Sequence, residues 1–256
     1  MNSLIVFFMC CCCLPTSLMA AEVPWHEVKS AHFQVFFKHC PKAFVDSVVA
    51  SAEQNYHDTM TTLGFTRYKS WTWQNRPKIY VFDGPEDYKG SNMEWSAGTA
   101  RIDQREIMTF PMAQGFFDSV LPHELGHIIF HEAIGMDNNI PLWLDEGVAM
   151  YLEKGQRLGA DDAVRQAARE GKFISLEELG SMKLTNATGV SAVQLFYEEA
   201  ASLVGFLLHR YETYRFDRLC RELNKGTPFE WALPKAYMEL RTVSDLEKAW
   251  RKYLQL

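Results

Sequence analysis

The sequence predicts an α+β protein in which a mixed sheet precedes a helical lobe, and three observations support this fold class. Before residue 116 the chain carries short runs of alternating apolar and polar residues, typical of strands, around one helical stretch. After residue 116 the apolar spacing is helical almost to the end. With 47% hydrophobic and 23% charged residues among 256, the composition is that of an ordinary globular protein. A sheet with its helix followed by further helices is the layout of two lobes around a cleft.

The first 21 residues have the features of a secretory signal peptide. They contain no charged side chain, and an apolar run at residues 4–14 ends at Pro15, ahead of the small residues Ala20 and Ala21. The run is too short for a membrane-spanning helix, which needs about 20 apolar residues. We expect cleavage near Ala21 and a mature protein that is secreted or periplasmic, without stable membrane insertion. A buried or artefactual start is the alternative, because only the amino terminus supplies positive charge ahead of the run.

Net charge bears on the partners of the protein, and cysteine content bears on disulfides. The formal net charge of −6 gives no reason to expect nucleic acid or an anionic membrane as a partner. Four of the six cysteines lie in the leader, which leaves Cys40 and Cys220. These two could pair in an exported protein, but one pair is no disulfide framework, and we expect both to be unpaired. The oligomeric state is not predicted.

The first half of the chain is expected to form strands around one helix. Residues 32–36 and 78–82 are typical of short strands, and the turn sequence Asp-Gly-Pro ends the second one. Pro41 stands where a first helical turn tolerates proline, and the helix that it opens runs to a stop at Gly64. Residues 98–110 form one or two further strands with an interruption in the middle. This segment is either the edge of the sheet or an ordinary internal strand.

The second half is expected to be a bundle of helices. Three helix starts in it are marked by a Ser or Thr followed three residues later by Glu, the pattern of a capping box. The pairs are Ser175 with Glu178, Thr227 with Glu230 and Ser244 with Glu247, and Pro228 adds a first-turn proline. The predicted organisation is a signal peptide at 1–21, an N-terminal α+β lobe at 22–140 and a C-terminal helical lobe at 141–256.

The residues from His123 to His127 spell HELGH, an HExxH motif within an apolar, helical stretch. Because positions four apart lie on one face of a helix, both imidazoles can point at one metal ion. Glu124 is turned about 100° from His123, beside the metal rather than on it, which is where a base for the attacking water belongs. Pro122 would cost a backbone hydrogen bond inside a longer helix, so we expect a helix start or kink just upstream.

A second helix supplies a third ligand of the right kind. In PLWLDEG, residues 141–147, Glu146 presents a carboxylate, and catalytic zinc takes three protein ligands and leaves one position for water. Asp145 beside it either accepts a hydrogen bond from a zinc-bound imidazole or belongs to exposed helix surface. Gly147 indicates close approach of two helices. His131, one turn beyond HELGH, is expected only to cap or cover the helix end.

HELGH followed by eighteen residues and the Glu of LWLDEGVAMYLE resembles the gluzincin metallopeptidases, the clan of thermolysin-like enzymes and large zinc aminopeptidases. The compact peptidase MA-like proteins are the most similar, because LGF at 63–65 and AG at 97–98 also match their pattern. The resemblance implies a thermolysin-like zincin fold, with an N-terminal mixed sheet and active-site helix and a C-terminal helical lobe. It also implies zinc held by His123, His127 and Glu146, with Glu124 as general base.

The resemblance further implies hydrolysis of a peptide bond. Zinc lowers the pKa of water to about 7, and Glu124 accepts the proton and passes it to the leaving amine. Clan relatives stabilise the oxyanion with a Tyr or His from the C-terminal lobe, and Tyr197 is our candidate for this role. A tyrosine packed between helices is the alternative for Tyr197, and Tyr151 and Tyr211 are weaker candidates.

We therefore predict a zinc-dependent metallopeptidase that acts on peptide or protein substrates. No aminopeptidase signature of the GxMEN type precedes HELGH, which favours an endopeptidase. Extended peptides commonly bind such enzymes by adding to a sheet edge, for which residues 98–110 are the candidate. The alternative is a latent or non-catalytic protein that keeps the zinc fold for partner contact. Against this alternative, a purely structural site would close the fourth zinc position with protein.

Overall fold

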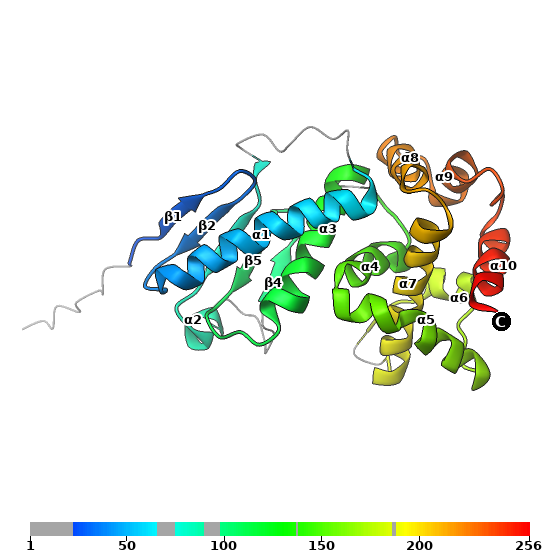
Figure 1. Ribbon diagram of the computed structural model, residues 1–256, viewed down its shortest axis with the longest axis horizontal. Helices are drawn as coiled ribbons and strands as arrows, with labels where there is room; N and C mark the ends of the chain where they lie inside the picture. Colours follow the sequence, from blue (N-terminus) through cyan, green and yellow to red (C-terminus); the bar gives the residue numbers. More distant parts are fainter. Residues whose placement is uncertain (1–22, 66–74, 90–97, 137, 186–187) are drawn as a thin grey trace, which may run out of the picture.

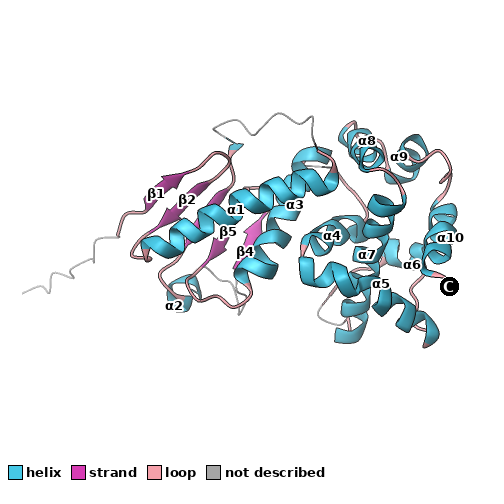
Figure 2. Ribbon diagram, in the orientation of Figure 1, coloured by secondary structure: helices cyan, strands magenta, loops and turns pink. Residues whose placement is uncertain are grey.

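The protein is an α+β structure with a small mixed sheet in its first half and a helical body in its second, as the sequence predicts (Figure 1, Figure 2). The computed structural model describes residues 23–256 apart from 66–74, 90–97, 137 and 186–187. The expected signal peptide and Ala97 of the AG match lie outside the described residues. All residues of the predicted metal site lie within them.

Five short strands form the sheet, in the order β1-β2-β3-β5-β4. They are β1 (His26–Lys29), β2 (Gln34–Phe37), β3 (Lys78–Val81), β4 (Gly98–Arg101) and β5 (Glu106–Thr109). The three central strands are parallel, and each outer strand is antiparallel to its neighbour. Val35, Ile79 and Ile107 lie side by side in this register and are fully buried, so they form an aliphatic row across the middle of the sheet.

The segment at residues 98–110 forms both an edge strand and an internal strand. Among the described strands, β4 pairs only with β5, whereas β5 also pairs with β3, so β4 is the edge strand of this sheet. Between them the chain turns at Arg105, whose φ of 55° is left-handed. The opposite edge, β1, was not predicted, because its side chains are mostly exposed and show no alternating apolar pattern. The short helix α2 (Pro85–Lys89) was not predicted either.

One face of the sheet is crossed by α1 (Lys42–Leu63), which lies beside α3 (Leu121–Ile134) (Figure 1). As predicted, α1 starts directly after Pro41 and stops at Gly64, which has a left-handed φ of 75°. Glycine adopts this conformation without the steric cost of a Cβ atom. A buried stripe along α1 faces the protein interior and includes Val45, Val48 and Ala52.

A π-helical segment, η2 (Phe116–Val120), leads directly into α3. Pro122 lies in the first turn of α3, but the backbone is already helical through η2. The irregularity expected just upstream of Pro122 is therefore a change from π-helix to α-helix at Leu121. Most of α3 is buried, including Leu125 and Ile128, so this helix forms part of the core as well as carrying the HELGH motif.

The helical body follows α3. Its helices are α4 (Leu142–Leu152), α5 (Lys154–Arg169), α6 (Leu176–Ser181), α7 (Val190–Arg210), α8 (Thr213–Asn224), α9 (Phe229–Ala236) and α10 (Val243–Leu254). Among the described residues, no helix is both long enough and apolar enough to cross a membrane. The predicted division after residue 140 falls in the connection between α3 and α4 and stays a prediction.

Two glycines allow α4 to pack closely against both of its neighbours. A Cβ atom on Gly147 would lie 2.5 Å from the carbonyl oxygen of Ala200 on α7, a separation that a real side chain does not tolerate. A Cβ atom on Gly126 of α3 would lie 2.8 Å from Leu152 and 3.2 Å from the backbone of Ala149, both on α4. The close approach expected at Gly147 is confirmed. The glycine of HELGH brings the two ligand-bearing helices together in the same way.

Of the two hydrogen bonds that make a capping box, the predicted box at α6 forms the one to the Ser175 side chain. The hydroxyl of Ser175 accepts a hydrogen bond from the Glu178 N–H at 3.2 Å. The box expected at Thr227 is wrong, because α9 begins after Pro228 and its start has no side-chain cap. Pro228 thus lies just outside the helix rather than in its first turn.

The box expected at Ser244 and Glu247 is also wrong in register. The helix starts two residues earlier, where Thr242 and Asp245 form a complete capping box. Glu247 instead accepts a hydrogen bond from the Leu176 N–H at 2.8 Å, which joins α10 to the start of α6. The sequence TVSDLE could form a capping box either between Thr242 and Asp245 or between Ser244 and Glu247. The first is formed, and Glu247 is instead used in the contact with α6.

Cys40 and Cys220 are free and buried, as expected. Cys40 precedes α1 and Cys220 lies on α8. Burial raises the pKa of both thiols, which disfavours the reactive thiolate.

Glu199 on α7 is a buried carboxyl group outside the predicted site. One of its oxygens accepts the Ile174 N–H at 2.9 Å, and the other has no partner among the described residues. Burial raises the pKa of Glu199 to about 8, whereas an unfolded chain has a glutamate pKa of about 4.3. Between these two values the unfolded chain is ionised and the folded chain keeps its proton. The stability of the fold therefore falls as the pH rises from about 4 to about 8.

We expect Glu199→Gln to stabilise the protein by on the order of 1–3 kcal/mol at pH 8 and to have little effect near pH 4. Glutamine keeps the acceptor for Ile174 and cannot ionise. Thermal unfolding followed by circular dichroism at both pH values measures the difference. Glu198→Gln on the same helix is the control and should show no such pH dependence. An equal shift in melting temperature at both pH values for Glu199→Gln would contradict the buried, protonated carboxyl.

Candidate metal centre

Three potential ligand side chains converge between α3 and α4, and we call His123, His127 and Glu146 the ligand cluster. The two imidazole Nε2 atoms are 3.2 Å apart, and the Glu146 carboxylate oxygen lies 3.8 Å from His123 and 3.7 Å from His127. Ligand atoms about 2 Å from a zinc ion, at tetrahedral angles, are roughly 3.3 Å apart. The donor set and its spacing therefore fit a zinc ion. Among the described residues no second group of three such side chains comes together.

The antiparallel packing of α3 and α4 creates this convergence. Residues early in α3 meet the end of α4, and residues late in α3 meet its beginning: His123 contacts Glu153, and His131 contacts Asp145. The side chains of His123 and Glu146 each keep about a fifth of their surface exposed (20% and 20%), whereas His127 is 9% exposed. The cluster is thus held in the core on one side and is open to solvent on the other.

His127 is oriented by the acid that precedes Glu146. Its Nδ1 atom lies 2.8 Å from a carboxylate oxygen of Asp145. Because a carboxylate only accepts, Nδ1 carries the proton and the Nε2 lone pair faces the cluster. Burial alone would raise the pKa of Asp145, but hydrogen bonds from His127 and His131 hold it well below its usual range. Of the two predicted alternatives for Asp145, the hydrogen bond to an imidazole is therefore present.

His123 is oriented by Glu153, which sequence reasoning missed. Its Nδ1 atom lies 2.8 Å from one oxygen of the Glu153 carboxylate, and the hydroxyl of Ser119 donates to the other oxygen. Glu153 is 6% exposed and directly follows α4. Its position seven residues after Glu146, two helical turns along the same face, was the available signal in the sequence.

We expect Glu153→Gln to weaken metal binding by about 10- to 100-fold, the usual range when the carboxylate behind a liganding histidine is lost. Competition against a chelating dye measures the affinity. Glu177→Gln, at an exposed position on α6, is the matched control and should bind metal like the wild type. Unchanged affinity in Glu153→Gln would show that His123 does not need this partner.

Glu124 lies beside the ligand cluster in an environment that favours its protonated form. Burial raises the pKa of this carboxyl most, the two histidines of the cluster oppose the rise, and the negative charges of Glu146 and Glu153 add to it. A carboxylate with increased proton affinity is better suited to take a proton from water at neutral pH. Glu124 is thus a carboxyl group beside the ligand cluster that is not itself one of the three ligands.

Among the three tyrosines considered, Tyr197 on α7 is the one that lies near the carboxylates of the site. Burial and then the charges of Glu146 and Glu124 raise the pKa of its phenol. The Tyr151 hydroxyl is instead bonded to His209 at 2.7 Å. Tyr211 packs edge to face against Tyr237 at the junction of α7 and α8. The structure thus separates the first candidate from the other two by position.

His131 does more than cover the end of the helix. Its Nε2 atom lies 3.1 Å from the Asp145 oxygen that His127 does not use. Its side chain is 14% exposed. The expectation that it only caps or covers the helix end is therefore wrong, because the sequence did not show that α4 brings Asp145 opposite two successive turns of α3.

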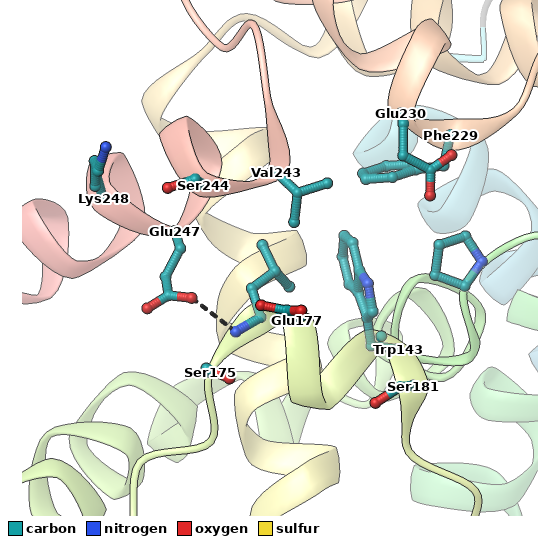
Figure 3. Close-up of a pocket in the computed structure, with 13 residues that line it drawn as sticks. Trp143, Ser175, Glu177, Ser181, Phe229, Glu230, Val243, Ser244, Glu247 and Lys248 are labelled. Carbon is teal, nitrogen blue, oxygen red and sulfur yellow. Dashed lines mark hydrogen bonds between the residues drawn. The ribbon is translucent and has the colours of Figure 1, made fainter.

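A cavity of about 570 Å³ lies apart from the ligand cluster, where the first turns of α4, α6, α9 and α10 meet (Figure 3). Trp143 and Phe229 pack edge to face beside it, with ring centres 5.4 Å apart. Three glutamates and one lysine line it as well: Glu177, Glu230, Glu247 and Lys248. No residue of the ligand cluster lines this cavity, so the size of a hollow alone does not identify the metal centre.

A comparison with known protein families agrees with the motif. The family model described as the peptidase MA superfamily matches residues 68–256, which include the whole ligand cluster. The solved structure of native yeast LTA4 hydrolase is similar at 15% identity and a TM-score of 0.49, over 90% of this chain and 38% of that one. The complex of yeast LTA4 hydrolase with bestatin gives 16% identity and a TM-score of 0.47, over 90% and 39%. This chain therefore spans less than half the length of those structures. A search of curated proteins found no match. The extent of the family match shows that the chain belongs to the peptidase MA superfamily, as its HELGH and EGVA motifs predict.

Proposed function

We propose that this chain is a zinc-dependent metallopeptidase with a thermolysin-like arrangement, in which His123, His127 and Glu146 hold the metal. One observation carries the proposal. Both histidines of the ligand cluster have their Nδ1 atoms held at 2.8 Å by a carboxylate, so both Nε2 lone pairs face the same point as the Glu146 oxygen. Histidines that merely fill a core have no need of this shared orientation.

The chemistry follows from the groups around that point. When bound, zinc supplies Lewis acidity that lowers the pKa of water and polarises a carbonyl group. Glu124, one residue after His123 and partly buried, accepts a proton from the attacking water. The same carboxyl then returns the proton to the leaving amine of the cleaved peptide. The position of Glu124 beside the ligand cluster, without being one of its ligands, supports both steps.

Tyr197 is our candidate for stabilising the oxyanion that forms on the substrate carbonyl. Its phenol is protonated at neutral pH and can therefore donate a hydrogen bond. The charges of Glu146 and Glu124 act on this phenol, which places Tyr197 near the site. Tyr197→Phe separates this role from simple packing, because phenylalanine preserves the ring and removes only the hydroxyl.

The edge strand β4 is our candidate for holding the substrate backbone. In the part of the chain that the structure describes, β4 has a strand partner, β5, on one side only. Gly98 at its start packs against Val120 and Phe116 of η2, directly ahead of the metal-binding helix. An extended peptide that adds to this edge can continue in both directions, which fits an endopeptidase better than an aminopeptidase. The signal-peptide features of the first 21 residues support secretion or a periplasmic location.

A peptide library tests the proposed activity. The protein is incubated with free and N-terminally acetylated peptides, with and without a zinc chelator, and the products are identified by mass spectrometry. We expect internal cleavage of both sets and its loss on chelation. Removal of single residues from free peptides alone would indicate an aminopeptidase instead. Zinc binding without cleavage of any peptide would favour the alternative of a non-catalytic or latent protein that acts through partner contact.

A further inference from the structure

We infer that His131 is a positioning residue of the metal centre, acting on His127 through the Asp145 carboxylate. The inference rests on the proposed function, since it concerns how firmly the ligand cluster holds its metal. His131 lies outside HELGH, and its ring is not part of the ligand cluster. It reaches the cluster through a single shared carboxylate.

The geometry places Asp145 between two imidazoles on successive turns of α3. One carboxylate oxygen faces His127 Nδ1 at 2.8 Å, and the other faces His131 Nε2 at 3.1 Å. A carboxylate held at both oxygens cannot rotate about its own axis without breaking a bond. Its first oxygen is therefore fixed where it keeps the His127 ring aimed at the metal.

The other nitrogen of His131 indicates which proton this ring carries. His131 Nδ1 is buried and has no hydrogen-bond partner among the described residues. Because the Asp145 carboxylate can only accept, the hydrogen bond at 3.1 Å requires the proton to be on Nε2. The buried Nδ1 then carries the lone pair of the neutral ring.

The hydrogen bonds that hold His123 follow the same pattern. There the Glu153 carboxylate accepts from His123 with one oxygen and from the Ser119 hydroxyl with the other. Each histidine of the cluster is thus backed by a carboxylate, and each carboxylate is fixed at its second oxygen by another donor. His131 has the place behind His127 that Ser119 has behind His123.

The expected effect of removing His131 is smaller than that of removing the carboxylate itself. The Asp145 side chain is 21% exposed, so water can replace part of the lost hydrogen bond. We expect His131→Phe to speed metal loss to a chelator by about three- to tenfold, below the range for loss of the carboxylate partner. His131→Gln, whose amide nitrogen can reach the position of Nε2, should restore most of the wild-type rate.

The experiment loads the full-length protein with zinc and follows zinc release to a chelating dye by stopped flow. The variants are His131→Phe, His131→Gln and, as a matched control, His32→Phe, which breaks a histidine hydrogen bond to the Glu53 carboxylate on α1, away from the ligand-bearing helices. Melting temperatures of the apo proteins report any general loss of stability. The inference predicts faster release for His131→Phe, near wild-type release for His131→Gln and no change for His32→Phe.

A double-mutant comparison tests whether the effect of His131 passes through Asp145. In an Asp145→Asn background, His131→Phe should add no further acceleration, because the carboxylate that transmits its effect is gone. Equal release rates for wild type and His131→Phe, or the same acceleration in both backgrounds, would overturn the inference. Failure of the wild type to bind zinc would instead contradict the proposed function.

Discussion

Replacing Glu124 with glutamine is expected to lower peptide cleavage by about 10²- to 10⁴-fold, the contribution of a positioned general base. Glutamine has the same shape but cannot take the proton from water or return it to the leaving amine. The carboxyl is not one of the three cluster ligands, so metal content and melting temperature should stay close to those of the wild type. Steady-state cleavage of one fluorogenic peptide, identified from the library, measures the change.

Glu132→Gln is the matched control for this substitution. Glu132 lies on the same helix and pairs with Arg105 rather than with the ligand cluster. Its variant should cleave at nearly the wild-type rate. If Glu124→Gln retained most of the activity with zinc bound, another residue would have to be the base, and the assigned role of Glu124 would be wrong.

Removing the third ligand is expected to have the second large effect. Structural zinc sites with four ligands are worth roughly 10–16 kcal/mol, so one ligand contributes on the order of 3 kcal/mol. Glu146→Ala should therefore weaken zinc binding by roughly a hundredfold or more and abolish cleavage at low zinc concentration. Isothermal titration with zinc measures the affinity.

The control for Glu146→Ala is Glu178→Gln, an exposed carboxylate on α6. It should bind zinc like the wild type, which shows that losing one negative charge is not enough to weaken binding. Wild-type affinity in Glu146→Ala would remove Glu146 from the ligand set. The histidines alone would then have to hold the metal.

The parts of the site that could be predicted from the sequence depend on local spacing. His123 and His127 are four residues apart on one helix, so their shared face follows from helical geometry alone. Glu146 was recognisable because a carboxylate in a helical segment follows at the spacing of a known family. Gly147 was recognisable because an in-helix glycine often marks a close approach of two helices.

The parts that could not be predicted depend on how α3 and α4 meet. Glu153 and His131 acquire their partners only through the antiparallel packing that Gly126 permits, and no local pattern specifies that crossing. The same limit applied to the fold. β1 is too exposed to show an apolar pattern, and the sequence offered two possible capping boxes for α10, of which Thr242 with Asp245 is the one formed.

The most direct test of this account is the zinc content of the wild-type protein. The folded protein is loaded with zinc, dialysed against metal-free buffer and analysed by elemental mass spectrometry. A ligand cluster of two histidines and one glutamate predicts about one zinc ion per chain. A folded protein that retains no zinc would contradict the metal centre, and with it the proposed peptidase mechanism.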